Sequence, residues 1–344
     1  EALVYQLPDG KCAKIFKSKN NSVMKKEKIR IMVRKLGAMR AVDAALMSRL
    51  AWPEKMLYNE QREWIGYIMP AFSNTHPFAD YSYDTFPALI PNVSKADQIR
   101  MSVALTELVD FLHYNNIVLC DINTSNILFD NDQNAYLIDL DSAQVAFEEK
   151  VFPTNVGLPD YLSPEHIRSC TFDFIKKKCD DVWILQNLIF KILTPCGHPY
   201  SSSIYCEDDR EYVEKGIYPF QFDKHPAEEK IRGGPWYNVI SHLPYYLKEG
   251  FWESFHGEGK WFHEKERRPV SYWLNILVRY QEDLPALTAY DAESGKYLPS
   301  RAKKAPPPKA KVISKESSSL ADFNELLKKL PLEAKKNKSW DSMV

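Results

Sequence analysis

The feature that most constrains this chain is a pair of short apolar runs with acidic or amide side chains at fixed places around them. The runs at 127–129 and 135–138 predict two strands joined by a tight turn. Asp121 and Asn126 precede the first run, and Asp139 follows the second. Such a strand pair can carry the three side chains to one place, and their short oxygen-bearing groups suit Mg²⁺, which can bridge phosphate groups. Taken alone, acidic loop residues of this kind are more typical of solvated turns.

The composition bounds the class of protein. The chain has 344 residues, 44% of them hydrophobic, enough for one large or two modest domains. Its net charge of −1 gives no electrostatic reason to expect a nucleic acid or membrane partner. The six cysteines form no CxxC pair and have no histidine cluster, so we expect reduced thiols. No apolar run approaches the roughly 18 residues of a membrane helix and no signal peptide is visible, so we expect a cytoplasmic protein.

The N-terminal segments alternate between strand and helix patterns. Residues 2–7 and 12–16 predict a hairpin around the turn at 8–10. The basic stretch at 25–36 predicts a helix, and 64–70 predicts a buried strand that ends at a proline. On that helix, the apolar face is expected to consist of Ile29, Val33 and Leu36.

The remaining segments are mostly helical by pattern. Apolar spacing predicts a helix over about 96–115, and helices dominate beyond residue 180. Residues 302–318 are rich in Lys, Pro, Ala and Ser, which is typical of a linker. An apolar stripe from Leu320 to Leu330, with Ser319 as a possible helix cap, predicts a short helix that packs on the domain or on a partner.

The segment from Leu119 to Phe129 resembles the catalytic loop of protein kinases, and Asp139-Leu140-Asp141 resembles their metal-binding DFG motif. The loop keeps Asp121 and Asn126 but lacks the usual His and Arg. Further segments resemble kinase motifs in the family's order, over about residues 1–286. These are Ala13-Lys14 (the VAIK lysine), Tyr161–Glu165 (the APE element), Asp181–Leu185 (the helix that braces the catalytic loop), Gly197–Tyr200 (the GxxPF turn) and Arg268-Pro269 (the late arginine that pairs with Glu165).

The resemblance implies an α+β, bilobal protein-kinase-like fold with a small β-rich N-lobe and a larger helical C-lobe. We expect the N-lobe at 1–72 and the C-lobe at 73–287, followed by a linker at 288–318 and an amphipathic tail at 319–344. The first five residues resemble the stretch that follows the glycine-rich loop, so the sequence is expected to begin inside that loop.

The resemblance also implies a binding site for ATP. Lys14 would contact the α- and β-phosphates, with Glu27 on the following helix as its partner and Glu63 as an alternative. Met69 would be the gatekeeper beside the adenine pocket. The hinge, whose backbone would meet adenine, would consist of Pro70, Ala71 and Phe72, with ordinary core or loop positions as the alternative.

The chemistry would lie with three side chains. Asp121 would orient or deprotonate the acceptor hydroxyl, and Asn126 and Asp139 would hold Mg²⁺. Asp141 would be a further metal ligand or an outer-shell group. Glu165 would form a structural ion pair with Arg268.

Four positions depart from the family pattern. Cys120 replaces an arginine that reads a phosphorylated activation loop, so that switch is not expected. Asn123 stands where a lysine steadies the γ-phosphate, and Leu158 where a threonine contacts the catalytic Asp. Asp141 replaces the glycine of DFG and adds negative charge.

The segments 139–144 and 268–273 resemble a divergent group of bacterial kinase-like proteins. Members of this group are encoded near phosphatase or tellurite-resistance genes, or are fused to helix-hairpin-helix segments. The expected function is therefore a Ser/Thr protein kinase that uses ATP and Mg²⁺, with a protein substrate that the sequence does not name and a cognate phosphatase or signalling partner. The alternatives are a pseudokinase that serves as a scaffold and, ranked lower, a small-molecule kinase.

Overall fold

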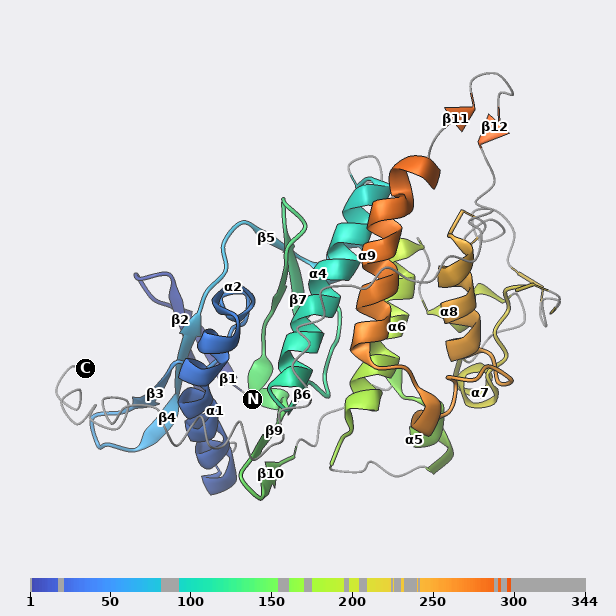
Figure 1. The fold of residues 1–344 in the computed structure, drawn as a ribbon. Coiled ribbons are helices and arrows are strands. Elements are labelled where there is room, and N and C mark those ends of the chain that lie inside the picture. Colours follow the sequence, from blue (N-terminus) through green and yellow to red (C-terminus); the bar gives the residue numbers. More distant parts are fainter. Residues whose placement is uncertain are drawn as a thin grey trace.

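The structure, a computed structural model, describes most of the chain up to residue 297. The described residues are 2–17, 22–81, 93–153, 161–169, 175–194, 198–203, 209–223, 225, 230–231, 240, 242–287, 290–291 and 296–297. A β-sheet with the first helices forms one side of the molecule, and most of the remaining helices form the other (Figure 1). This arrangement confirms the predicted α+β class.

The N-terminal part is a four-stranded antiparallel sheet in the order β1-β2-β4-β3, with helix α1 against it. Its elements are β1 (Ala2–Gln6), β2 (Lys11–Phe16), α1 (Val23–Val42), α2 (Ala44–Met47), β3 (Lys55–Tyr58) and β4 (Trp64–Pro70). Ser22 caps α1 by accepting a hydrogen bond from the Lys25 N–H, and Asp43 caps α2 in the same way through Leu46. The predicted hairpin and the strand at 64–70 are confirmed, and the helix is longer than expected.

The C-terminal part is built around the long helix α4. Its elements are β5 (Thr75–Pro77), η2 (Phe78–Tyr81), α4 (Lys95–Tyr114), β6 (Ile117–Val118), β7 (Ile127–Asp130), β8 (Ala135–Leu137), η4 (Leu140–Ser142), β9 (Gln144–Phe147), β10 (Lys150–Phe152), α5 (Pro164–Ser169), α6 (Lys178–Leu193), η6 (Pro199–Ser202), α7 (Asp209–Lys215), α8 (Tyr245–Phe255), η8 (Glu264–Glu266) and α9 (Val270–Leu287). A capping box between Ser94 and Asp97 fixes the start of α4, and α4 packs on both α6 and α9. The helix predicted over 96–115 is thereby confirmed.

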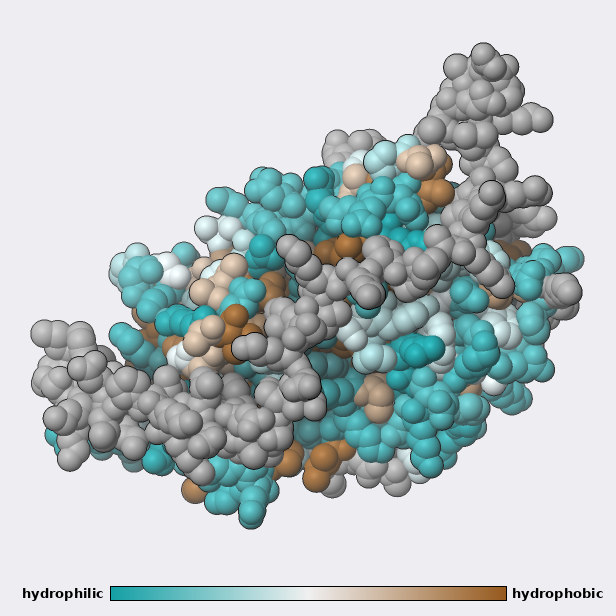
Figure 2. Space-filling view, in the orientation of Figure 1, coloured by the Kyte–Doolittle hydropathy of each residue, from teal (hydrophilic) through white to brown (hydrophobic). Residues whose placement is uncertain are grey.

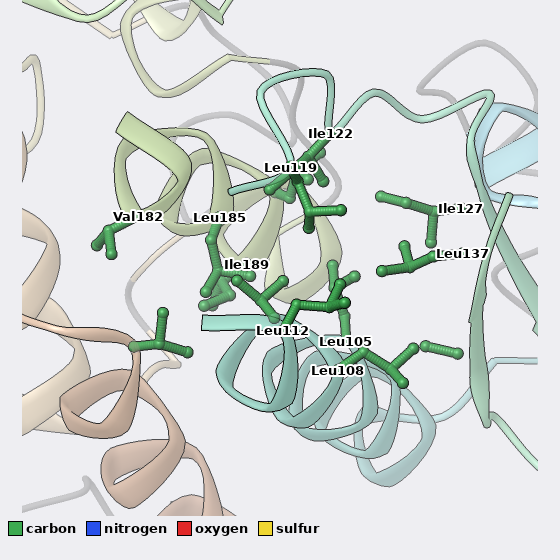
Figure 3. Packing of buried hydrophobic residues seen from close by; sticks show 14 of the residues in the cluster. Leu105, Leu108, Leu112, Leu119, Ile122, Ile127, Leu137, Val182, Leu185 and Ile189 are labelled. Atoms are coloured by element: carbon green, nitrogen blue, oxygen red, sulfur yellow. The ribbon is translucent and has the colours of Figure 1, made fainter. Parts of the chain in front are cut away.

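Leucines of α4 bury the base of the loop between β6 and β7. Leu105, Leu108 and Leu112 point into a cluster with side chains from the loop, the β7–β8 strand pair and α6 (Figure 3). The other labelled side chains of the cluster are Leu119, Ile122, Ile127, Leu137, Val182, Leu185 and Ile189. Because apolar anchors occupy both sides of residues 119–127, the polar residues between them are held on a rigid base.

The chain after α2 joins the N-terminal part to the strand pair. The Ala51 N–H donates to Leu137 O at 2.9 Å, and the Leu137 N–H donates to Arg49 O at 3.1 Å. These bonds fix β8 directly before Asp139, so the two parts of the molecule share the segment that carries this acid.

The last described residues form a short antiparallel pair, β11 (Tyr290–Asp291) with β12 (Lys296–Tyr297), inside the segment predicted as a linker. The tail predicted at 319–344 lies outside the described residues. No helix in the described ranges is long and apolar enough to span a bilayer. The face in Figure 2 is mostly hydrophilic, with small separate hydrophobic areas.

Glu165 forms the predicted ion pair, but with the neighbour of the expected arginine. Arg267 donates to both Glu165 oxygens, at 3.1 and 3.0 Å, and its side chain is fully buried. Arg268 instead lies over the rings of Trp261 and Tyr272. The assignment to Arg268 was therefore wrong, because the turn that precedes α9 directs the first of the two arginines inward.

Lys35 of α1 is a fully buried lysine that donates to Ala146 O of β9 at 3.3 Å. Burial lowers the pKa of Lys35 from 10.5 to about 7. The unfolded chain keeps this proton up to about pH 10.4. Between these values the unfolded state binds more protons, so the free energy of unfolding should rise with pH, by a few kcal/mol (about 1.4 kcal/mol per unit at most).

We therefore expect Lys35→Met to be more stable than the parent at pH 7. The increase in the free energy of unfolding between pH 7 and 10, expected for the parent, should be mostly absent in this variant. Urea unfolding at several pH values measures both effects. Lys150→Met, at an exposed position of β10, is the control and should keep the parent's pH dependence. Equal pH slopes for the parent and Lys35→Met would contradict the expectation.

Candidate active site

The loop between β6 and β7, which carries Asp121 and Asn126, and Asp139 just after β8 meet at one pocket. Asp121, Asn126 and Asp139 all line it, together with apolar side chains such as Ile122 and Leu140. The Asn126 amide lies 3.4 Å from Asp121 O and 3.5 Å from Asp121 Oδ2. The Ile138 N–H donates to Asn126 O at 3.0 Å, which ties the loop to the end of β8. The pocket therefore presents two carboxylates and an amide to the same space.

Hydrogen bonds of the Asn123 side chain stabilise the conformation of this loop. Its side-chain oxygen accepts from the N–H groups of Ser125 (2.9 Å) and Asn126 (3.1 Å), and its amide donates to Asp121 Oδ1 at 2.9 Å. Asp121 is thereby oriented by a neutral amide at the position where protein kinases carry a lysine.

Asp181, at the start of α6, braces the same loop from below. Its carboxylate accepts from the N–H groups of Leu119 (2.7 Å) and Cys120 (2.9 Å), and His113 Nε2 lies 2.9 Å from it. The side chain is completely buried. Cys120 has a φ of 65°, which is unfavourable for a residue with a side chain, and the Asp181 bonds hold it there. The bracing contact predicted for Asp181 is confirmed.

Asp139 directly precedes η4, Asp141 lies within it, and both contact the same lysine. Asp139 has φ 61° and ψ 37°, a left-handed conformation that Asp tolerates better than most residues. Lys14 of β2 donates to Asp139 and, at 2.5 Å, to Asp141 Oδ1. The Asp139 side chain is 45% exposed and that of Asp141 only 6%. Asp139 therefore faces the pocket, and Asp141 faces the protein interior.

The charges of this cluster shift one another's pKa values. Burial alone would lower the pKa of Lys14, but the charges of Asp141 and Asp139 outweigh it and raise the pKa. Burial raises the pKa of Asp139, and the Asp141 charge adds to this against the opposing effect of Lys14. Burial likewise opposes ionisation of Asp141, yet the charge and hydrogen bond of Lys14 and the bond from Tyr67 hold its pKa at about 2. Asp141 is therefore a permanent buried anion.

Glu27 does not form the ion pair predicted with Lys14. Glu27 is 44% exposed and pairs with Arg30 one turn along α1, at 3.2 Å. Helix α1 instead directs Lys25 toward the site, with its Nζ 3.6 Å from Asp141 Oδ2. The alternative, Glu63, accepts from the Asn59 side-chain amide at 2.9 Å, and its own backbone N–H donates to Asn59 Oδ1 at 2.8 Å, in the β3–β4 turn. Asp141 thus takes the place that was assigned to a glutamate.

The predicted gatekeeper and hinge lie at the end of β4. Met69 is 8% exposed and pairs with Cys12 on β2, two residues from the Lys14–Tyr67 pair, so the four side chains share one face of the sheet. Next to them, Pro70 pairs with Lys11, and the Ala71 N–H donates to Gly10 O at 3.1 Å. The Phe72 ring packs on that of Tyr136, with centroids 4.8 Å apart. Adenine contacts by these residues stay predictions.

The donor set fits Mg²⁺ at Asp139 and Asn126, two residues with side-chain oxygens that line the pocket. It does not fit Mg²⁺ at Asp141, because Lys14 and Tyr67 already occupy Oδ1 and Lys25 faces Oδ2. In the part of the chain that the structure describes, no group of three or more His, Cys, Asp or Glu residues could hold a metal ion by itself.

Sequence reasoning missed Tyr67 and Lys25 as members of the site. Tyr67 donates to Asp141 Oδ1 at 2.8 Å and is fully buried. Burial raises its pKa well above 10, and Asp141 raises it further. The register of β2 with β4 could have pointed to Tyr67, because it is the direct cross-strand neighbour of Lys14.

The fold and the site together define a class of protein. Residues 82–231 match the protein kinase domain family. This match, together with the β-rich and helical parts and the pocket lined by Asp121, Asn126 and Asp139, supports a divergent protein-kinase-like protein.

The similar proteins are bacterial and eukaryotic kinases. The chain is 25% identical to protein kinase YegI of Escherichia coli K12 over 63% of its own length and 34% of that protein's. It is 24% identical to YegI of E. coli O157:H7, over 72% and 38% of the two lengths. It is also 32% identical to the cAMP-dependent protein kinase catalytic subunit of Dictyostelium discoideum, over 33% and 17%. The chain thus spans little more than a third of the YegI proteins.

Proposed function

We propose that this chain is a phosphotransferase of the Ser/Thr protein kinase type, which moves the γ-phosphate of Mg²⁺-bound ATP to a protein hydroxyl. The observation that carries this proposal is the convergence of Asp121, Asn126 and Asp139 on one pocket, with Lys14 bonded to Asp139 at its edge. The similarity to the YegI kinases supports it.

Each side chain has a defined task in this proposal. Asp139 and Asn126 would hold Mg²⁺, which neutralises charge on the phosphates. Lys14, on strand β2, would bind phosphate oxygens. Asp121, oriented by Asn123, would accept the proton of the acceptor hydroxyl as its oxygen bonds to phosphorus and ADP leaves.

The test is phosphate transfer from labelled ATP with Mg²⁺ to a panel of protein acceptors and to the chain itself. The parent should incorporate label on Ser or Thr, and Asp121→Ala and Asp139→Ala should fall to background. Asp132→Ala, an acid on the exposed β7–β8 turn, is the matched control and should behave as the parent. Equal incorporation by all four proteins would defeat the proposal.

A pseudokinase is the second candidate, and one observation favours it. Lys14 interacts with two carboxylates at once. Such contacts are consistent with a lysine that is withheld from a ligand as well as with one that is positioned to bind it. Binding of Mg²⁺-ATP without transfer to any acceptor would support this candidate. Turnover of a small hydroxyl compound without protein labelling would instead support a small-molecule kinase. A cytoplasmic location, expected from the hydrophobicity pattern, and a cognate phosphatase partner, expected from the family resemblance, stay predictions.

A further inference from the structure

Asp141 joins three separate elements at one carboxylate. Its Oδ1 accepts from Lys14 of β2 at 2.5 Å and from the Tyr67 hydroxyl of β4 at 2.8 Å. Its Oδ2 lies 3.6 Å from Lys25 Nζ, in the first turns of α1. The side chain is 6% exposed. A buried anion with donors from three elements fixes the position of those elements relative to one another.

The surroundings of Asp141 suit a counter-ion better than a metal ligand. A metal ligand needs a free oxygen directed at the cation, and Asp139 offers one from a side chain that is 45% exposed. Lys14 and Lys25 place positive charge on both Asp141 oxygens. A divalent cation at the same oxygens would be repelled by these ammonium groups.

Helix α1 presents bases, not acids, to this cluster. Lys28 lies one turn after Lys25 and is 7% exposed, and the Asp141 charge acts on it. Lys25 also lies 4.0 Å above the Phe16 ring, which holds its ammonium group in place. Glu27 points away, toward Arg30. The charges that join the helix to the site are therefore an acid on η4 and lysines on the helix.

We propose that Asp141 is a positioning residue that holds Lys14 for the phosphates of the nucleotide and couples it, through Lys25, to the start of α1. The proposal rests on the proposed function for its catalytic consequence, but the contacts on which it depends exist without nucleotide. A movement of α1 would change the distance between Lys25 and Asp141, and with it the strength of the interaction between Asp141 and Lys14. The position of the helix would therefore determine how firmly Asp141 holds Lys14.

The test measures initial rates of phosphate transfer over a range of ATP and of Mg²⁺ concentrations, with the whole chain. Asp141→Asn should lower kcat/KM for ATP about tenfold or more, as expected for a lost charge-assisted bond. Its Mg²⁺ half-saturation should stay unchanged. Asp141→Glu should recover part of the loss. Tyr67→Phe and Lys25→Met should act in the same direction with smaller effects.

Lys26→Met is the matched control for Lys25→Met, because Lys26 faces the Tyr58 ring instead of Asp141. It should behave as the parent. A tenfold shift of Mg²⁺ half-saturation in Asp141→Asn, with no effect of Tyr67→Phe or Lys25→Met, would make Asp141 a metal ligand and overturn the proposal. Parent-like kinetics of Asp141→Asn would overturn it as well.

Absence of transfer by the parent would defeat the proposed function and leave the positioning role to a second measurement. Thermal unfolding without nucleotide of Tyr67→Phe, Asp141→Asn, Lys25→Met and their pairwise combinations supplies it. Losses in the double variants smaller than the sums of the single losses would support the linkage. Additive losses in the two pairs that contain Asp141→Asn would overturn it.

Discussion

Asp181→Ala is expected to lose about 3–5 kcal/mol of folding free energy, because it removes the buried acceptor of two backbone N–H groups and the partner of His113. Without the carboxylate, the N–H groups of Leu119 and Cys120 stay buried and unsatisfied. Cys120 would also lose the bond that holds its left-handed conformation. Because Asp121 follows directly, phosphate transfer should fall together with stability.

Urea unfolding of the parent, Asp181→Ala and Asp181→Asn measures this effect. The asparagine keeps one acceptor oxygen, so the free energy of unfolding of Asp181→Asn should lie between that of the parent and that of Asp181→Ala. Asp132→Ala makes the same change on an exposed turn and should stay within about 0.5 kcal/mol of the parent. A similarly small change for Asp181→Ala would show that the loop keeps its shape without the brace.

The local part of the site was open to prediction from sequence. The β7–β8 strand pair follows from two apolar runs around an Asp-Asn-Asp turn, and it places Asn126 and Asp139 by chain connectivity alone. The spacing from Asp121 through Asn126 also stays within one loop. These features depend on neighbours in the chain, so a pattern of residues is enough to find them.

The inward face of α1 was not predictable in the same way. Ile29, Val33 and Leu36 were expected on it, but the structure buries Ile29 with Met32, Lys28 and Lys35 and leaves Val33 and Leu36 only partly buried. Two lysines therefore occupy positions where a hydrophobic pattern expects apolar residues. Their burial is made possible by distant groups, Asp141 near Lys28 and Ala146 O at Lys35, which local periodicity does not reveal.

The same limit explains the two misplaced ion pairs. Glu27 lies on α1, as assumed, but on the solvent side of it, since the helix phase is set by burial of the neighbouring residues. Arg267 and Arg268 are adjacent and chemically identical, so only packing of the chain before α9 decides which one reaches Glu165. In both cases the ion-pair partner is determined by tertiary contacts and not by residue type.

Gly66→Ala is expected to cost about 3 kcal/mol or more, because its added methyl group would meet backbone rather than a side chain that can move. A Cβ at position 66 would lie 1.9 Å from Lys14 O and 3.1 Å from Ile15 Cα. Strands β2 and β4 would have to separate where Lys14 and Tyr67 face each other. The variant should therefore lose affinity for Mg²⁺-ATP as well as stability.

Gly10→Ala separates this steric effect from the ordinary cost of replacing a glycine. Gly10 has a φ of 71° and open space where a Cβ would lie, so its replacement should cost only about 1–2 kcal/mol of backbone strain. Thermal unfolding and nucleotide binding by calorimetry compare the two variants. Gly66→Ala should be the less stable and the weaker binder, since only its methyl group displaces the strand that carries Lys14. Equal losses in the two variants would mean that β2 and β4 can separate without moving this lysine.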